Sequence, residues 1–207
     1  AQRGARRGEQ AMKDQDQATF RTLLAHAVRA PSGHNTQPWR FRFDDGGLLL
    51  VADRSRALPV VDPVDRELTI SCGAILDHLE VAALAMGRPL AIAPYPDAAD
   101  PDLLARVSLT GEAAPSATTL FEAIPHRRTT RARFEQRPLP EALARQCAAT
   151  AARFDVDLTL ISDDARRRAV ADLVAEGDRL QFADPAFRRE LAAWIRSRRA
   201  TRQDGMS

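Results

Sequence analysis

The chain has 207 residues, of which 44% are hydrophobic and 28% charged, and its formal net charge is +2. This length and composition can bury the core of one domain or of two small ones, as in a globular protein. No apolar run approaches the roughly 20 residues that span a bilayer, so we expect no membrane insertion. The N-terminus shows no hydrophobic signal core and the chain has only two cysteines, so we expect a reducing, cytoplasmic location.

The first part of the chain combines helix and strand patterns. Residues 1–18 are polar, basic and aperiodic, which predicts a flexible tail. Residues 19–29 place apolar side chains at helical spacing. Residues 39–43 and 48–52 predict strands, and the turn residues between them predict a hairpin.

The longest helical pattern covers residues 65–86 and is stopped by Gly87. Small side chains gather on it at positions 71–74, which would let another backbone approach closely. We interpret this stretch as the central helix of the fold or as a helix of a dimer interface. Residues 90–95 and 103–109 predict two further strands.

The second half repeats this order in a weaker form. We expect helices at residues 118–124, 140–154, 163–183 and 185–197, and a strand at residues 156–161. The repeat of helix, strand and long helix suggests two related units. We place the first at residues 19–124 and a second, incomplete one at residues 125–207.

A polar loop separates the first predicted helix from the first predicted strand. Residues 31–38 read Pro-Ser-Gly-His-Asn-Thr-Gln-Pro, so two hydroxyls, an imidazole and two side-chain amides gather in a few positions. A simple connector needs only a few turn residues. A loop so dense in donors and acceptors is typical of a binding loop on a rigid scaffold.

An arginine-rich stretch follows about ninety residues later. Arg127, Arg128, Thr129 and Arg131 offer three guanidinium groups and a hydroxyl within five residues. Guanidinium groups bind phosphate with two parallel hydrogen bonds, and a hydroxyl adds another. A solvated run of charge and a nucleic-acid-binding patch are the alternatives for such a cluster taken alone.

Taken together, the two stretches resemble signatures of the flavin-dependent nitroreductase superfamily. The pattern Pro31-Ser32-Gly33-His34-Asn35-x-Gln37-Pro38-Trp39 resembles its flavin loop, and Arg127-Arg128-Thr129-x-Arg131 resembles its phosphate-binding segment. Their order resembles the Acg-type FMN-binding branch, in which two nitroreductase-like units are fused. Residues 53–59, residues 66–74 and the tail Asp204-Gly205-Met206 also resemble that branch. The resemblance implies an α+β fold with a central antiparallel sheet flanked by helices and a long central interface helix.

The resemblance also implies an FMN site at the interface of two units, within one chain or in a homodimer. The implied cofactor-binding residues are Pro31, Ser32, Gly33, His34, Asn35, Gln37, Arg127, Arg128, Thr129 and Arg131. Arg127 and Thr129 would hold the phosphate, with Arg128 beside them. Arg131 would reach the ribityl chain or the N1/O2 edge. The loop would line the flavin ring, although His34 could equally lie in a solvent-exposed turn.

The function that the resemblance implies is FMN-dependent reduction of small electrophiles, such as nitroaromatics or quinones, with NAD(P)H in a ping-pong hydride transfer. The flavin would carry the hydride, so no catalytic side chain is expected. The sequence shows no metal-ligand spacing, and we expect no metal. The first alternative is an FMN-binding or storage protein without turnover. A basic RNA-binding or interaction module is a third class, which rests only on the arginine clusters.

Overall fold

The structure is a computed structural model that describes residues 13–130, 132–135, 137–197 and 203–206. By its contacts the chain divides into two compact units. The described residues up to Thr129 and from Arg189 onward form the first unit, and those between these two positions form the second. The described residues after position 188 therefore fold with the first unit, whereas we expected them in the second.

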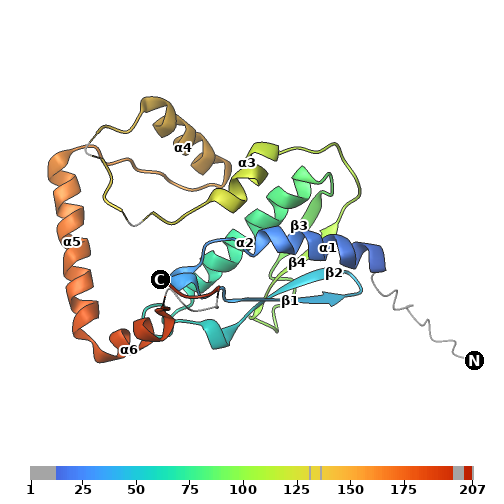
Figure 1. Ribbon diagram of the computed structural model, residues 1–207, viewed down its shortest axis with the longest axis horizontal. Coiled ribbons are helices and arrows are strands. Elements are labelled where there is room, and N and C mark those ends of the chain that lie inside the picture. The colour runs from blue at the N-terminus through green and yellow to red at the C-terminus, as the bar shows by residue number, and fades with distance from the viewer. Residues whose placement is uncertain (1–12, 131, 136, 198–202, 207) are drawn as a thin grey trace, which may run out of the picture. The chain divides into compact units, whose positions relative to one another are not determined.

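The first unit is built on a four-stranded antiparallel sheet (Figure 1). Its strands are β1 (Trp39–Asp44), β2 (Gly47–Ala52), β3 (Leu90–Pro94) and β4 (Leu103–Leu109). They lie in the order β1-β2-β4-β3. All four strands were predicted, because each carries an apolar or alternating run bounded by turn residues.

The β1–β2 hairpin turns as its sequence predicts. Asp44 pairs with Gly47 at its end. The Asp44 carboxylate accepts a hydrogen bond from Gly46 N at 2.9 Å and from the Arg106 guanidinium at 2.7 Å. The hydrogen bond from Arg106 holds the pKa of Asp44 below its ordinary value. One ionised carboxylate therefore fastens the turn to the neighbouring strand β4.

Helix α1 (Asp14–Ala27) precedes the sheet in the chain. It begins earlier than the predicted residue 19, so the predicted tail extended too far into the chain. Asp14 and Asp16 lie in its first turn. Carboxylates are favourable at this end of a helix because they face the positive end of its dipole, which explains why a polar stretch can still begin a helix.

Helix α2 (Arg66–Ala85) forms the centre of the first unit and matches the predicted long helix closely. Its buried side chains pack against α1 and against one face of the sheet. The fully buried members of this core include Phe20, Leu23, Leu48, Leu50, Ile75, Leu79 and Val107. Burial on this scale, at roughly 25 cal/mol per Å² of apolar area, is what fixes the sheet to the helices.

By length and composition alone, α2 would also be long and apolar enough to cross a membrane. Its apolar window is 39% buried inside the structure, however, and its buried residues face the core of the first unit. The core helix of a folded domain meets the same criterion. The expectation that the chain does not enter a membrane therefore stays a prediction.

A short helix, α3 (Thr118–Ala123), and the 3-10 turn η3 (Ile124–His126) lead out of the sheet region. The second unit contains α4 (Glu141–Arg153) and α5 (Asp164–Ala183). Helix α6 (Pro185–Trp194) begins in the second unit and ends in the first. All four helices were predicted to within a few residues.

The predicted strand at residues 156–161 is wrong, because this segment forms no strand. Val156, Leu158 and Leu160 are all exposed. A strand needs a neighbour to accept and donate its backbone hydrogen bonds, and among the described residues none pairs with this segment. The proposed repeat of the first unit therefore lacks its strand.

Candidate functional site

The polar loop lies between α1 and β1, where it forms the 3-10 turn η1 (Gly33–Asn35). Three of its residues have left-handed backbone conformations, with φ of 46° at His34, 54° at Asn35 and 53° at Gln37. Such conformations are uncommon in residues other than glycine and cost of order 1 kcal/mol each. The surrounding chain must therefore hold this loop in place.

The first anchors of the loop come from the loop itself and from α2. The Ser32 hydroxyl accepts a hydrogen bond from Gln37 N at 2.9 Å, and Ser32 O accepts one from Asn35 N at 2.9 Å. Gly33 N donates to the buried Ser71 hydroxyl at 3.2 Å. The small side chains predicted on the central helix thus do let another backbone approach, and that backbone is the loop.

Cys72 supports the end of the same loop. Its thiol donates to Pro38 O at 3.4 Å. Burial raises the pKa of this thiol to about 12, so it is protonated at neutral pH and unsuited to act as a nucleophile. Cys72 is thus the buried packing thiol that its place on an apolar helix suggests. No group of His, Cys, Asp or Glu in the described part of the chain could hold a metal ion.

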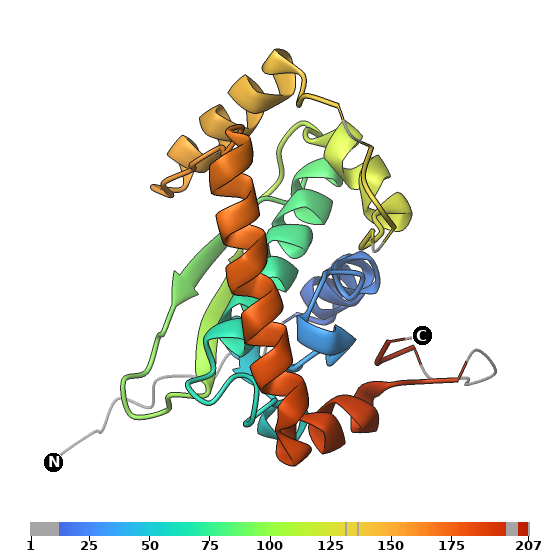
Figure 2. The ribbon, with the colours of Figure 1, turned by 90° about the vertical axis from the view of Figure 1, so that its left-hand side faces the viewer.

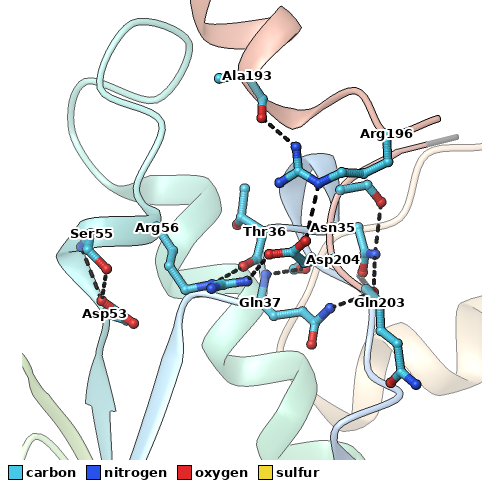
Figure 3. Close-up of polar contacts among 12 residues, drawn as sticks. Asn35, Thr36, Gln37, Asp53, Ser55, Arg56, Ala193, Arg196, Gln203 and Asp204 are labelled. Carbon is cyan, nitrogen blue, oxygen red and sulfur yellow. Dashed lines mark hydrogen bonds and ion pairs between the residues drawn. The ribbon is translucent and has the colours of Figure 1, made fainter. Parts of the chain in front are cut away.

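The two amide side chains of the loop point toward residues near the end of the chain (Figure 3). Asn35 Nδ2 donates to Gln203 O at 3.1 Å and to Gly205 O at 2.9 Å. Gln37 Nε2 donates to Gln203 O at 3.0 Å. Both hydrogens of the Asn35 amide are therefore used by the protein itself.

Arg56 joins the loop to the same end of the chain, from the 3-10 turn η2 (Arg54–Arg56) that follows β2. Its Nε donates to Thr36 O at 2.5 Å, and its Nη2 lies 2.7 Å from Asp204 Oδ2. Asp53 begins this turn and accepts hydrogen bonds from Ser55 N and Oγ, at 3.1 and 2.6 Å.

Asp53 also forms an ion pair with Arg40 at 2.7 Å. Burial alone would raise the pKa of Asp53, but the hydrogen bonds from Arg40 and Ser55 outweigh that effect, and the pKa lies below its ordinary value. The carboxylate is therefore ionised at neutral pH. Its hydrogen bonds stabilise the turn η2, which places Arg56 next to the loop.

The predicted phosphate-binding stretch lies at the end of α3 and η3. Arg127 Nη2 donates to Arg29 O at 3.2 Å, and its Nη1 lies 3.5 Å from the Thr129 hydroxyl. Arg128 Nη1 donates to the carbonyls of Pro125 and Arg127, at 3.3 and 3.1 Å. Both arginines and Thr129 are exposed. Arg131 lies outside the described residues.

One of these contacts joins the arginine stretch to the segment that precedes the polar loop, within the first unit. Arg29, which accepts the hydrogen bond from Arg127, lies only three positions before Ser32. In the described part of the chain, neither Arg127 nor Arg128 forms an ion pair with a carboxylate. Among the described residues, the hydrogen-bond partners of these two guanidinium groups are backbone carbonyls and the Thr129 hydroxyl, and only Arg127 is bonded to the segment before the loop.

A groove lies beside this junction. It has a volume of about 630 Å³ and is lined by His26, Arg29, Phe121, Glu122, Pro125 and His126. The His26 and Phe121 rings lie 4.8 Å apart across α1 and α3. His26 and Phe121 are half-buried, whereas the remaining lining residues are exposed. The volume falls within the range of small-molecule sites.

Sequence reasoning missed the residues that support the loop from outside it. Arg56, Trp194 and Arg196 were given no role, although the stretches 53–59 and 204–206 stood out by resemblance. Their sequence signal is weak, because exposed arginines are common in this chain. Only the fold shows that Arg56 and Arg196 both pair with the carboxylate of Asp204.

Comparison with known proteins places these features in context. No protein-family model matches the chain. It is 38% identical over 180 residues to a Mycobacterium tuberculosis (strain H37Rv) protein named "Putative NAD(P)H nitroreductase Rv3131", covering 86% of this chain and 52% of that protein. It is 34% identical over 178 residues to "Putative NAD(P)H nitroreductase acg" of the same strain, covering 84% of this chain and 53% of that one.

A more distant relative comes from another organism. The chain is 28% identical over 190 residues to "Probable NAD(P)H nitroreductase PigM" of Serratia sp. (strain ATCC 39006), covering 86% of this chain and 53% of that protein. The chain thus spans about half the length of the curated relatives it matches. These relatives support the nitroreductase family for this chain, and its α+β architecture with a four-stranded antiparallel sheet is consistent with a nitroreductase-like fold.

Proposed function

We propose that this chain provides the flavin loop and the phosphate-binding segment of an FMN-dependent, NAD(P)H-oxidising nitroreductase. The observation that supports this proposal most directly is the hydrogen bond from Arg127 to Arg29 O, three positions before Ser32. It ties the arginine stretch, which resembles the family's phosphate-binding segment, to the residues just before the loop that resembles its flavin loop. The names of the relatives support the nitroreductase type of activity.

The donors of the arginine stretch fit a phosphate group. Arg127 and Arg128 are exposed and have no carboxylate partner among the described residues, and the Thr129 hydroxyl lies beside Arg127. Guanidinium forks and a hydroxyl are the groups that bind a phosphate most strongly. We propose that Arg127 and Thr129 hold the FMN phosphate, with Arg128 beside them. The role proposed for Arg131 stays a prediction.

The donors of the loop divide into two groups. The Ser32 hydroxyl accepts from Gln37 N, and in the described part of the chain its own hydrogen has no acceptor. Pro31, Ser32 and Gly33 are therefore the residues we propose to line the flavin ring. The amides of Asn35 and Gln37 are already bonded to residues 203–205. We propose that they shape the loop instead.

The chemistry that bound FMN supplies is hydride transfer from NAD(P)H to a small electrophile such as a nitroaromatic or a quinone. The residues of this chain bind and orient the cofactor. Guanidinium groups neutralise the phosphate charge, and the rigid loop fixes the position of the ring. We propose a second nitroreductase-like unit, in a longer chain or in a second copy, as the partner that completes the site.

The first test is the visible absorption spectrum of the purified protein after reconstitution with FMN, followed by addition of NADH or NADPH. We expect a yellow protein that binds FMN and is bleached by one of the two donors. Arg127→Ala should weaken FMN binding roughly 10- to 100-fold, because a charge-assisted contact to phosphate contributes about 1.5–3 kcal/mol. Fluorescence titration of FMN measures the dissociation constant.

The matched control is Arg133→Ala, which removes one positive charge from the same arginine-rich region. It should leave FMN affinity within about twofold of the wild type, since general surface charge contributes little at physiological salt. Equal affinity in wild type and Arg127→Ala would show that the phosphate site is misassigned. A yellow protein that neither donor bleaches would favour flavin storage, and a colourless protein that shifts RNA would favour the third class.

A further inference from the structure

The end of the described chain is fastened to the polar loop by a network of polar contacts (Figure 3). We call residues 189–197 and 203–206 the C-terminal arm; they belong to the first unit. Figures 1 and 2 both show its last residues beside the loop between α1 and β1. Gly205 N donates to Asn35 O at 3.1 Å, and Asn35 Nδ2 donates back to Gly205 O at 2.9 Å.

The Asp204 carboxylate joins the last described residues of the arm to Arg56. Asp204 lies between Arg56 and Arg196, with its two oxygens 2.7 and 3.2 Å from their guanidinium nitrogens. The Asp204 side chain is only 11% exposed and that of Arg196 is 16% exposed. Both guanidinium groups also lie over the Trp194 ring, 5.6 and 5.4 Å from its centre. A paired charge that is so little exposed is costly to break.

Arg56 contacts both the arm and the loop. While Nη2 pairs with Asp204, Nε donates to the carbonyl of Thr36, which lies between the left-handed residues Asn35 and Gln37. Thr36 is buried, with 2% of its surface exposed. The bend is thus held from both sides, by Arg56 on its backbone and by the arm on the amides of Asn35 and Gln37.

The arm is itself shaped for this contact. Met206 N donates to Trp194 O at 2.8 Å, and Arg196 N donates to Met206 O at 2.7 Å, so the chain returns on itself. Gly205 has φ of 81°, and a Cβ atom there would lie 2.5 Å from Trp194 O. Only glycine fits that position without a shift of the backbone.

A second anchor lies further back in the arm. Both carboxylate oxygens of Glu190 accept hydrogen bonds from the backbone, from Val60 N at 2.9 Å and Val61 N at 3.0 Å. The arm is therefore attached at two separated places, of which only the one at Asp204 reaches the loop. Removing the Asp204 carboxylate should free the loop without detaching the whole arm.

We infer that Asp204 and Gly205 are positioning residues, which hold Asn35 and Gln37 in their left-handed conformations and so keep the bend that directs Ser32 and Gly33 toward the flavin. Asn35 then recognises the arm and not the cofactor. This inference rests on the proposed FMN function. It extends the proposed binding site to a segment that lies about 170 positions after the loop.

The mechanism predicts a quantitative link between two measurements. If the loop adopts this bend in only a fraction of the molecules, the apparent dissociation constant for FMN is the intrinsic constant divided by that fraction. The same fraction sets how quickly the backbone amide hydrogens of Asn35 and Gln37 exchange with solvent. A residue that acted only on global stability would not move these two quantities together.

The test is Asp204→Asn, which keeps the shape of the side chain and removes its charge. We expect faster hydrogen exchange in a peptide that covers residues 31–38, with unchanged exchange in the sheet, and FMN binding weakened roughly 10-fold or more. Asp204→Glu, which keeps the carboxylate, should restore part of both. Asp102→Asn, which removes a carboxylate paired with Arg54 at 2.7 Å in the same unit, is the control and should change neither.

Each contrary result has a distinct meaning. Unchanged exchange at residues 31–38 in Asp204→Asn would overturn the inference, whatever happens to FMN. Faster exchange with unaltered FMN affinity would also overturn it, while leaving the proposed function intact. A wild-type protein that binds no FMN would overturn the proposed function and the inference with it.

Discussion

Two glycines of the first unit differ in what a side chain would meet. At Gly47 the backbone has φ of 140°, and a Cβ atom would lie 2.2 Å from Val107 O. At Gly73, in the middle of α2, a Cβ atom would meet nothing within 4 Å. The close approach that we expected around positions 71–74 therefore involves Ser71 and Cys72, whereas Gly73 faces open space.

We predict opposite effects for alanine at these two positions. Gly73→Ala should raise the free energy of unfolding by about 0.5–1 kcal/mol, because alanine loses less backbone entropy in a helix and meets no obstacle here. Gly47→Ala should lower it by more than 1 kcal/mol through backbone strain. Urea denaturation followed by circular dichroism measures both, and a destabilising Gly73→Ala would show that its face is covered.

The two longest helices share a length but differ in their surroundings. Helices α2 and α5 each have 20 residues. α2 buries Leu68, Ile75 and Leu79 among other side chains, whereas no described residue of α5 is buried. Helix α2 is therefore stabilised by tertiary packing, and α5 depends mainly on its own backbone hydrogen bonds and local ion pairs.

A matched pair of substitutions tests this difference. Leu79 is fully buried and Leu173 is 73% exposed. Leu79→Ala should cost about 2–5 kcal/mol of stability because it leaves a cavity, and Leu173→Ala should change stability by less than about 0.5 kcal/mol. Thermal and chemical denaturation of both variants give the values. A large loss for Leu173→Ala would mean that another surface covers α5 in solution.

At the scale of the whole molecule, the two units differ in how they are stabilised. The first has a continuous core of helix and sheet residues. In the second, α4 and α5 contain no buried residue among those described, and large apolar side chains such as Leu160 and Val174 are exposed. Segments with few buried contacts open at low free energy.

Hydrogen exchange of the intact chain should therefore show two classes of backbone amide. We expect amides of α2 to exchange only through global unfolding, and those of α4 and α5 to exchange faster by at least about two orders of magnitude. Mass spectrometry of peptic peptides resolves the helices in one experiment. Equal protection in α2 and α5 would contradict this view of the second unit.

Much of the first unit could be predicted because its signals are local. The hairpin of β1 and β2 follows from an alternating run and a turn at Asp45-Gly46, and α2 follows from its apolar spacing and Gly87. The same reasoning failed at residues 156–161. An apolar run there has the composition of a strand, but no strand among the described residues pairs with it, and composition cannot supply that neighbour.

The sequence by itself determined where the two polar stretches lie, because a run of donors between a helix pattern and a strand pattern can be read from neighbouring residues. Only the tertiary structure decided which of those donors are already used. Asn35 bonds to Gly205, 170 positions away, and Arg56 pairs with Asp204, 148 positions away. Contacts over such separations depend on how the whole unit packs, and no local pattern encodes them.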